Sequence, residues 1–196
     1  MRRRSTWIIG FVFALVVFQL MTGPGSSTAK SADQLKPPFV IQAQAMGTMT
    51  QMSRNYNITV RIQEYSPPGD QAILLEAFQA KGNEGLVNAL SKMPSKGRLA
   101  ITGTLGGDLA YIRKFEQPDG SVIIRMITNR LLRFGEVWAD TRSRDYQLSG
   151  AEITFGKDKK RSGTLIPAAE LKLEKDGSLG VETFQFPWKL MNIQLR

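Results

Sequence analysis

Most of the chain alternates between hydrophobic and polar positions with the two-residue period of β-strands. The first clear run is "NYNITVRIQEY", where Ile58, Val60 and Ile62 alternate with polar residues. Such alternation is typical of a strand with one buried face. Further runs of this kind occupy residues 98–105, 109–116, 122–129, 133–138, 146–155, 164–174, 179–186 and 190–195. The pattern therefore predicts about nine strands.

A helical period replaces this alternation after the first strand. In "SPPGDQAILLEAFQAKG", Leu74 and Phe78 share one helical face, and Gly82 is suited to ending a helix. Residues 84–92 repeat the helical pattern before a proline. We expect a pair of short helices inserted after the first strand.

Short glycine-containing turns separate several of the strands and indicate an antiparallel meander. A two-residue turn at Gly106-Gly107 would place Ile101 opposite Ile112. The apolar parity changes at Ser149-Gly150, which predicts a β-bulge. Pro167 lacks a backbone donor, so its strand is expected to lie at an edge or a bulge.

A flat sheet of this many strands would leave unprotected edges, so the meander is expected to close or bend. The predicted fold is mainly β within the α+β class: an antiparallel meander forming a barrel or strongly curved sheet, with the helix pair after the first strand. Residues 55–196 are expected to form this single β-rich domain.

The N-terminal segment has the layout of a secretory signal peptide over residues 1–29. Three arginines precede an apolar run from Trp7 to Met21, and small residues follow it. The run is short for a transmembrane helix, although an uncleaved anchor is the alternative. We expect export to the periplasm or the extracellular medium, with residues 30–54 forming a flexible arm.

The composition narrows the chemistry that this protein performs. The chain has no cysteine and no histidine, which excludes disulfides, thiolate catalysis, histidine-dependent triads and imidazole metal sites. The net charge is +9, with the cations spread along the chain rather than clustered, so no nucleic-acid partner is expected. These features favour a non-enzymatic role without a cofactor.

The densest set of functional side chains lies in "NRLLRFGEVWADTRSRDYQL", residues 129–148. Guanidinium groups bind carboxylates or phosphates, and a neighbouring aromatic ring supplies an apolar wall. The candidate ligand-binding residues are Arg130, Arg133, Trp138, Arg142, Arg144 and Tyr146. An ion-pair network with Glu136, Asp140 and Asp145 is the structural alternative. Those carboxylates also keep open a hydrolase that uses them as acid and base.

Two further motifs suggest binding of a metal ion and contact with lipid. Met46, Met49 and Met52 form a Met-x-x-Met-x-x-Met series, and thioethers are ligands that suit Cu(I). Docking of these methionines on a core is the alternative. The basic tip at residues 157–161 suits weak contact with anionic lipid, or else it is simply solvated.

Three stretches, "KGRLAITGTLGGDLAYIRKF", "RFGEVWADTRSRDYQLSGAEITF" and "PWKLMNI", resemble a group of small exported bacterial proteins of unassigned function. The resemblance spans about residues 56–193 and implies no activity. The leading hypothesis is an exported, non-enzymatic binding or envelope-interaction module. Its partner would be a small hydrophobic or anionic ligand, or an envelope protein, near residues 130–146.

Overall fold

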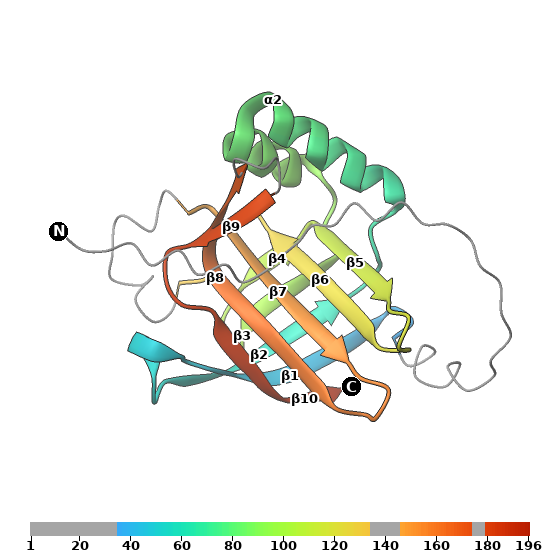
Figure 1. Ribbon diagram of the computed structural model, residues 1–196, viewed down its shortest axis with the longest axis vertical. Helices are drawn as coiled ribbons and strands as arrows, with labels where there is room; N and C mark the ends of the chain where they lie inside the picture. The colour runs from blue at the N-terminus through green and yellow to red at the C-terminus, as the bar shows by residue number, and fades with distance from the viewer. Residues whose placement is uncertain (1–34, 134–145, 174–178) are drawn as a thin grey trace, which may run out of the picture.

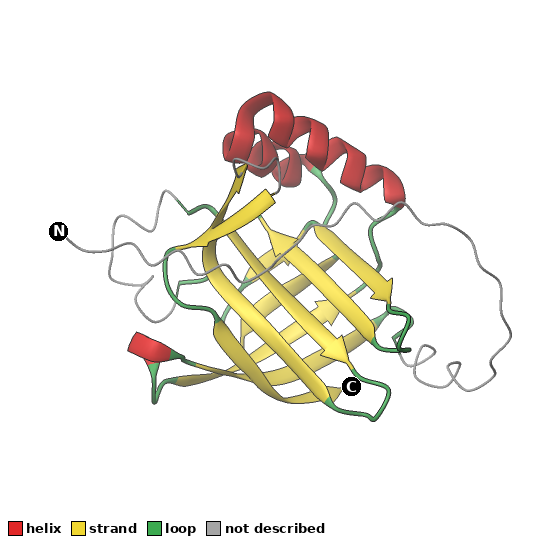
Figure 2. Ribbon diagram, in the orientation of Figure 1, coloured by secondary structure: helices red, strands yellow, loops and turns green. Residues whose placement is uncertain are grey.

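The computed structural model describes residues 35–133, 146–173 and 179–196 (Figures 1 and 2). The helices of this part are η1 (Met49–Gln51), a single 3-10 turn, and α2 (Pro68–Lys92). The strands are β1 (Phe39–Met46), β2 (Asn55–Ile62), β3 (Gly97–Ile101), β4 (Gly107–Leu109), β5 (Tyr111–Glu116), β6 (Val122–Thr128), β7 (Leu148–Phe155), β8 (Arg161–Leu173), β9 (Leu179–Thr183) and β10 (Trp188–Leu195).

The strands form one antiparallel sheet that curls until it nearly closes (Figure 1). Its order is β4-β3-β2-β1-β10-β8-β7-β6-β5, with β9 beside β8. The two ends of this order, β4 and β5, are separated along the chain only by Ala110. The predicted mainly β fold, an antiparallel meander in a barrel or strongly curved sheet, is therefore confirmed.

Strand β1 lies inside the segment that the sequence predicts as a flexible arm, residues 30–54, so the structure differs from that expectation. The strand pairs with β2 on one side and with β10 on the other. Ala43 and Ala45 occupy two of its inward positions. Because alanine has low β-propensity, the alternation in "FVIQAQAM" is weak in the sequence. The helix accordingly follows the second strand rather than the first.

Helix α2 is broken once, where the sequence predicts the boundary between two helices. Lys81 and Gly82 have non-helical dihedral angles, and Gly82 lies at φ +56° and ψ −141°. Asn83 fixes the break to the sheet, because its Nδ2 donates to the Leu171 carbonyl (2.6 Å) and its Oδ1 accepts from the Leu171 N–H (2.7 Å). The predicted helix pair corresponds to the two segments of α2 on either side of this break.

The helix covers the outer surface of one side of the sheet (Figure 2). Leu74, Leu86 and Leu90 of α2 pack in one apolar cluster with Tyr111 of β5 and Ile166 of β8. Burial raises the pKa of the Tyr111 hydroxyl, and the nearby Arg113 guanidinium partly opposes that rise. This second cluster lies outside the barrel and is separate from the interior core.

The interior of the barrel is a packed hydrophobic core. The Trp188 ring contacts the Tyr56 ring with centroids 5.5 Å apart. Interior side chains at 0% exposure are Ile41, Ala45, Val60, Leu99, Leu109, Ile112, Ile124, Ile153, Leu165, Trp188 and Leu190. A side chain lining a water-sized void would retain exposed surface, so these residues do not line a ligand cavity.

A β-bulge lies at the level of Ser149, but it is in the partner strand β8 and not at Ser149-Gly150, where the sequence predicts it. The change of apolar parity in β7 has another cause, because Leu148 packs in the α2 cluster whereas Ala151 and Ile153 face the interior core. The register between β7 and β8 shifts between Leu148 and Gly150. Only Ser149 lies between the two β7 positions, whereas Pro167 and Ala168 lie between their partners, so β8 carries the extra residue. Pro167 thus occupies the place where a missing backbone donor is least costly.

The glycines after β3 turn the chain, as the sequence predicts, but the turn is longer than two residues. Leu99 pairs with Gly107, so the predicted pairing of Ile101 with Ile112 is wrong. Gly103 and Gly106 both have positive φ, at +88° and +66°. Two left-handed positions let a wider loop connect β3 and β4.

Two glycines of α2 allow the backbone break to be tested by alanine substitution. An added Cβ would meet nothing within 4 Å at Gly69 or at Gly82, but only Gly82 has a positive φ. We expect Gly82→Ala to lower the free energy of unfolding by about 1–3 kcal/mol. Gly69→Ala should raise it by up to about 1 kcal/mol. Urea unfolding measures both, and equal losses would contradict the left-handed break.

Candidate functional site

The structure describes three of the six predicted ligand-binding residues, namely Arg130, Arg133 and Tyr146. The other three, Trp138, Arg142 and Arg144, lie outside the described residues, as do Glu136, Asp140 and Asp145. The ligand mouth, the ion-pair network and the carboxylate hydrolase therefore stay predictions.

The described part of this segment is anchored by its backbone. Ser149 Oγ lies 2.5 Å from the Arg130 carbonyl oxygen and accepts a hydrogen bond from the Leu132 N–H (2.9 Å). The side chains of Arg130 and Arg133 are exposed. Tyr146 instead faces β9, where its hydroxyl donates to Glu182 Oε1 (2.9 Å). Tyr146 is therefore engaged in holding β9.

The three methionines of the predicted copper motif are exposed on the β1–β2 connection. Met46, Met49 and Met52 have exposed fractions of 45%, 57% and 71%, so they do not dock on a core. Met191 of β10 lies beside them, because Gln44 pairs with Met191 and this places Met46 diagonally across from it. These thioethers are accessible from solvent.

The basic tip at residues 157–161 is held by internal contacts. Asp158 accepts from Lys160, with Nζ 2.8 Å from the carboxylate, and these hydrogen bonds hold the pKa of Asp158 below its usual range. Arg161 turns back toward β10 and donates to the Ile193 carbonyl (3.1 Å). The tip therefore presents fewer free cations than its sequence suggests.

A different surface emerges on the side of the barrel that α2 leaves uncovered (Figure 2). Strands β2, β1 and β10 lie side by side there, and we call their outward surface the amide face. Its side chains are Asn55, Asn57, Thr59 and Arg61 of β2, Val40, Gln42, Gln44 and Met46 of β1, Lys189, Met191, Asn192 and Gln194 of β10, and Arg196.

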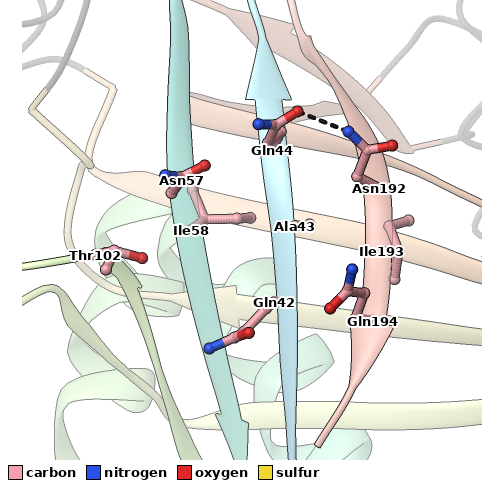
Figure 3. Close-up of a pocket in the computed structure, with 9 residues that line it drawn as sticks. All are labelled: Gln42, Ala43, Gln44, Asn57, Ile58, Thr102, Asn192, Ile193 and Gln194. Atoms are coloured by element: carbon pink, nitrogen blue, oxygen red, sulfur yellow. Dashed lines mark hydrogen bonds between the residues drawn. The ribbon is translucent and has the colours of Figure 1, made fainter.

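The strand register places the side chains at the centre of this face in rows that run across the three strands, which we call rungs. Gln42 lies between Thr59 and Gln194, and Gln44 lies between Asn57 and Met191. A hollow of about 530 Å³ opens over these rungs (Figure 3). Its polar lining consists of Gln42, Gln44, Asn57, Thr102, Asn192 and Gln194. This volume falls within the usual range of small-ligand sites.

A bulge in β10 turns Asn192 toward the hollow. Gln42 pairs with Gln194 but Gln44 pairs with Met191, so β10 carries one extra residue there. Asn192 adopts φ +52°, which asparagine tolerates better than most residues. Its Nδ2 donates to Gln44 Oε1 (2.7 Å; Figure 3). The bulge therefore joins two carboxamides of neighbouring strands.

Arg196 orients two further carboxamides. Its Nε donates to Gln42 Oε1 (3.4 Å), and its Nη2 donates to Gln194 Oε1 (3.3 Å). The oxygens of Gln42, Gln44 and Gln194 are thus engaged, which leaves their Nε2 groups to donate toward the hollow. These Nε2 groups and the Arg196 guanidinium are hydrogen-bond donors on this face.

The charged side chains of the amide face have one sign. The sequences of β1, β2 and β10 contain no aspartate or glutamate. Arg61, Lys189 and Arg196 supply exposed positive charges around the carboxamides. The face is therefore suited to ligands that are rich in acceptors and negatively charged.

Neither a search for other kinds of site nor comparison with known proteins assigns a function to this protein. Within the described ranges, no three acidic residues come together as a metal site, and no helix is long and apolar enough to span a membrane. No family model matches the chain, and no curated protein or solved structure matches it either. The function is therefore inferred from the site itself.

The left-handed conformation of Asn192 makes a prediction about stability. Asn192→Ala and Asn192→Gly both remove the carboxamide, but only alanine places a Cβ at φ +52°. We expect the alanine variant to be less stable than the glycine variant by about 1–2 kcal/mol. Thermal or urea unfolding measures the difference, and equal stabilities would contradict the bulge.

The copper hypothesis predicts that replacing Met46, Met49 and Met52 by leucine abolishes Cu(I) retention without unfolding the protein, because all three side chains are exposed. A competition titration with a Cu(I) chelator measures retention. Met126→Leu is the control, since Met126 is buried in the core. Equal Cu(I) retention by wild type and triple variant would remove the hypothesis.

Proposed function

We propose that this protein is an exported, non-enzymatic binding module that takes its ligand on the amide face. The observation that carries the proposal is the hollow of about 530 Å³ lined by carboxamides of three adjacent strands. Hydrogen bonds already orient four of these groups, namely Gln42, Gln44, Asn192 and Gln194. Such preorganisation reduces the entropy lost on binding.

The packed interior supports a site on the outside of the barrel. Trp188, Ile124 and Leu165 are at 0% exposure, so no ligand-sized void touches them. A ligand inside the barrel would have to displace this core, at a cost of several kcal/mol. Binding on the outer surface requires no such rearrangement.

The chemistry of the face supports binding rather than catalysis. Carboxamides do not titrate, and guanidinium groups stay protonated at physiological pH. A general acid or base needs a pKa near the working pH. Gln42, Gln44 and Gln194 are therefore suited to holding a ligand rather than to moving protons.

Export is supported by the N-terminal pattern and is compatible with the fold. Leu35 is buried and its carbonyl accepts a hydrogen bond from the Tyr65 hydroxyl (2.7 Å). Cleavage after Ala29 would precede this contact and leave every described element in the mature chain.

The absence of cysteine makes a direct test of the site possible. Thr102→Cys, at the hollow, and Gln79→Cys, exposed on α2, each carry a single thiol for an environment-sensitive fluorophore. We expect fractions of the host envelope to change the emission of the label at position 102 and not at position 79.

A third label distinguishes the two candidate regions. Arg133→Cys reports on the arginine-rich segment predicted from the sequence. A response at position 133 alone, or silence at position 102 in folded protein, would contradict binding at the amide face. Responses of equal size at all three positions would indicate nonspecific adsorption and would also contradict it.

Export itself predicts a mature N-terminus near Lys30. N-terminal sequencing of the protein from its native host measures this directly. Intact Met1 in the envelope-bound protein would replace secretion by a membrane-anchored form.

A further inference from the structure

We propose that the ligand of the amide face is a linear acidic polysaccharide, with its carboxylates on the cations and its hydroxyl groups on the carboxamides. This inference rests on the proposed function, because it names the ligand class of the same site. It follows from the orientation of the amides, the distribution of charge and the pairing of the strand backbones.

The orientation of the amides favours a ligand rich in acceptors. Gln44 Oε1 accepts from Asn192, while Gln42 Oε1 and Gln194 Oε1 accept from Arg196. The Nε2 groups of the three glutamines remain as donors beside the hollow. Sugar hydroxyl and carboxylate oxygens accept such hydrogen bonds.

The cations lie at the two ends of the face, with carboxamides between them. Lys189 pairs with Met46 at one end of β1. At the other end, Val40 pairs with Arg61 and exchanges backbone hydrogen bonds with Arg196. Six residue steps along β1 separate the two ends, which corresponds to roughly 20 Å. This separation suits a chain of several acidic sugar units better than a single small anion.

The pairing of the strands argues against an acidic peptide as the ligand. β1 and β2 each pair with a neighbour on both sides, and β10 pairs with β1 and β8. β10 pairs with β8 only through Trp188, Lys189 and Leu190, but β1 pairs with β2 on one side and β10 on the other, so the strand beneath the hollow has no edge for a peptide to extend the sheet. Recognition must use side chains alone, and sugar hydroxyl groups both donate and accept, as carboxamides do.

The same face also offers apolar side chains that can contact the sugar rings of an acidic polysaccharide. Met191 and Met46 are partly exposed diagonal neighbours on β10 and β1. Their flexible thioethers can lie against the C–H faces of pyranose rings. Asn57 and Thr102 add neutral polar groups at the opposite side of the hollow.

Isothermal titration with oligogalacturonates tests the proposal, with the fully methyl-esterified oligomers as the uncharged ligand. Gln42→Glu with Gln194→Glu places two negative charges on the face while keeping side-chain shape. Gln79→Glu with Asn88→Asp makes the same charge change on exposed positions of α2 and is the control. All four positions are exposed, so folding, checked by circular dichroism, should be retained.

We expect the face variant to bind oligogalacturonate at least tenfold more weakly than wild type, and the control variant to bind within about threefold. Methyl esterification should weaken binding to wild type at least tenfold, and added salt should weaken it progressively. Equal losses in the two variants, or equal affinity for charged and esterified oligomers, would overturn the acidic polysaccharide.

The outcome for polyglutamate separates this inference from the proposed function. Tighter binding of polyglutamate than of oligogalacturonate, lost in the face variant, would overturn the polysaccharide but retain a binding module at the amide face. Absence of oligogalacturonate binding would likewise overturn this inference, whereas the proposed function is judged separately, by the response of the label at Thr102→Cys relative to the labels at positions 79 and 133.

Discussion

The pairing of β1 with β2 on one side and with β10 on the other holds the sheet in its nearly closed form. It joins the N-terminal and C-terminal parts of the described fold and turns a meander into a nearly closed sheet. Without β1, the edges of β2 and β10 would expose unpaired backbone groups, which is costly and promotes aggregation. The same pairing buries Ile41 and Ala45 in the core. The same strand pairing therefore closes the sheet and completes the hydrophobic core.

Closure of the sheet separates an interior surface from an outer surface. The outer surface has two parts, one covered by α2 and one that carries polar side chains. The inward positions fill the interior with apolar side chains around Trp188. On the outside, α2 covers the region that includes β5 and β8, where Tyr111 and Ile166 add a second apolar cluster. The outer face that α2 does not cover carries carboxamides and cations. Helix placement therefore decides which part of the outer surface α2 covers.

Local patterns in the sequence predict several elements well. The alternation of Ile58, Val60 and Ile62 predicts β2, and Gly82 predicts the break between the two segments of α2. These features depend on neighbours within a few residues. The sequence does not predict β1, because the inward alanines of this strand weaken its alternation, and it predicts too short a turn before β4. In both cases the partner strands, rather than local propensity, set the structure.

In the candidate site, too, some features can be predicted from the sequence and others depend on the folded structure. The sequence alone is enough to predict most of the strand periodicity, the glycine break in α2 and the absence of histidine and cysteine chemistry. Only the tertiary structure decided that Gln44 and Asn192 meet, because 148 positions separate them along the chain. Cross-strand neighbours are set by register and closure, and one bulge changes which side chains share a face. For that reason the carboxamides of distant strands form a single surface only after the barrel closes.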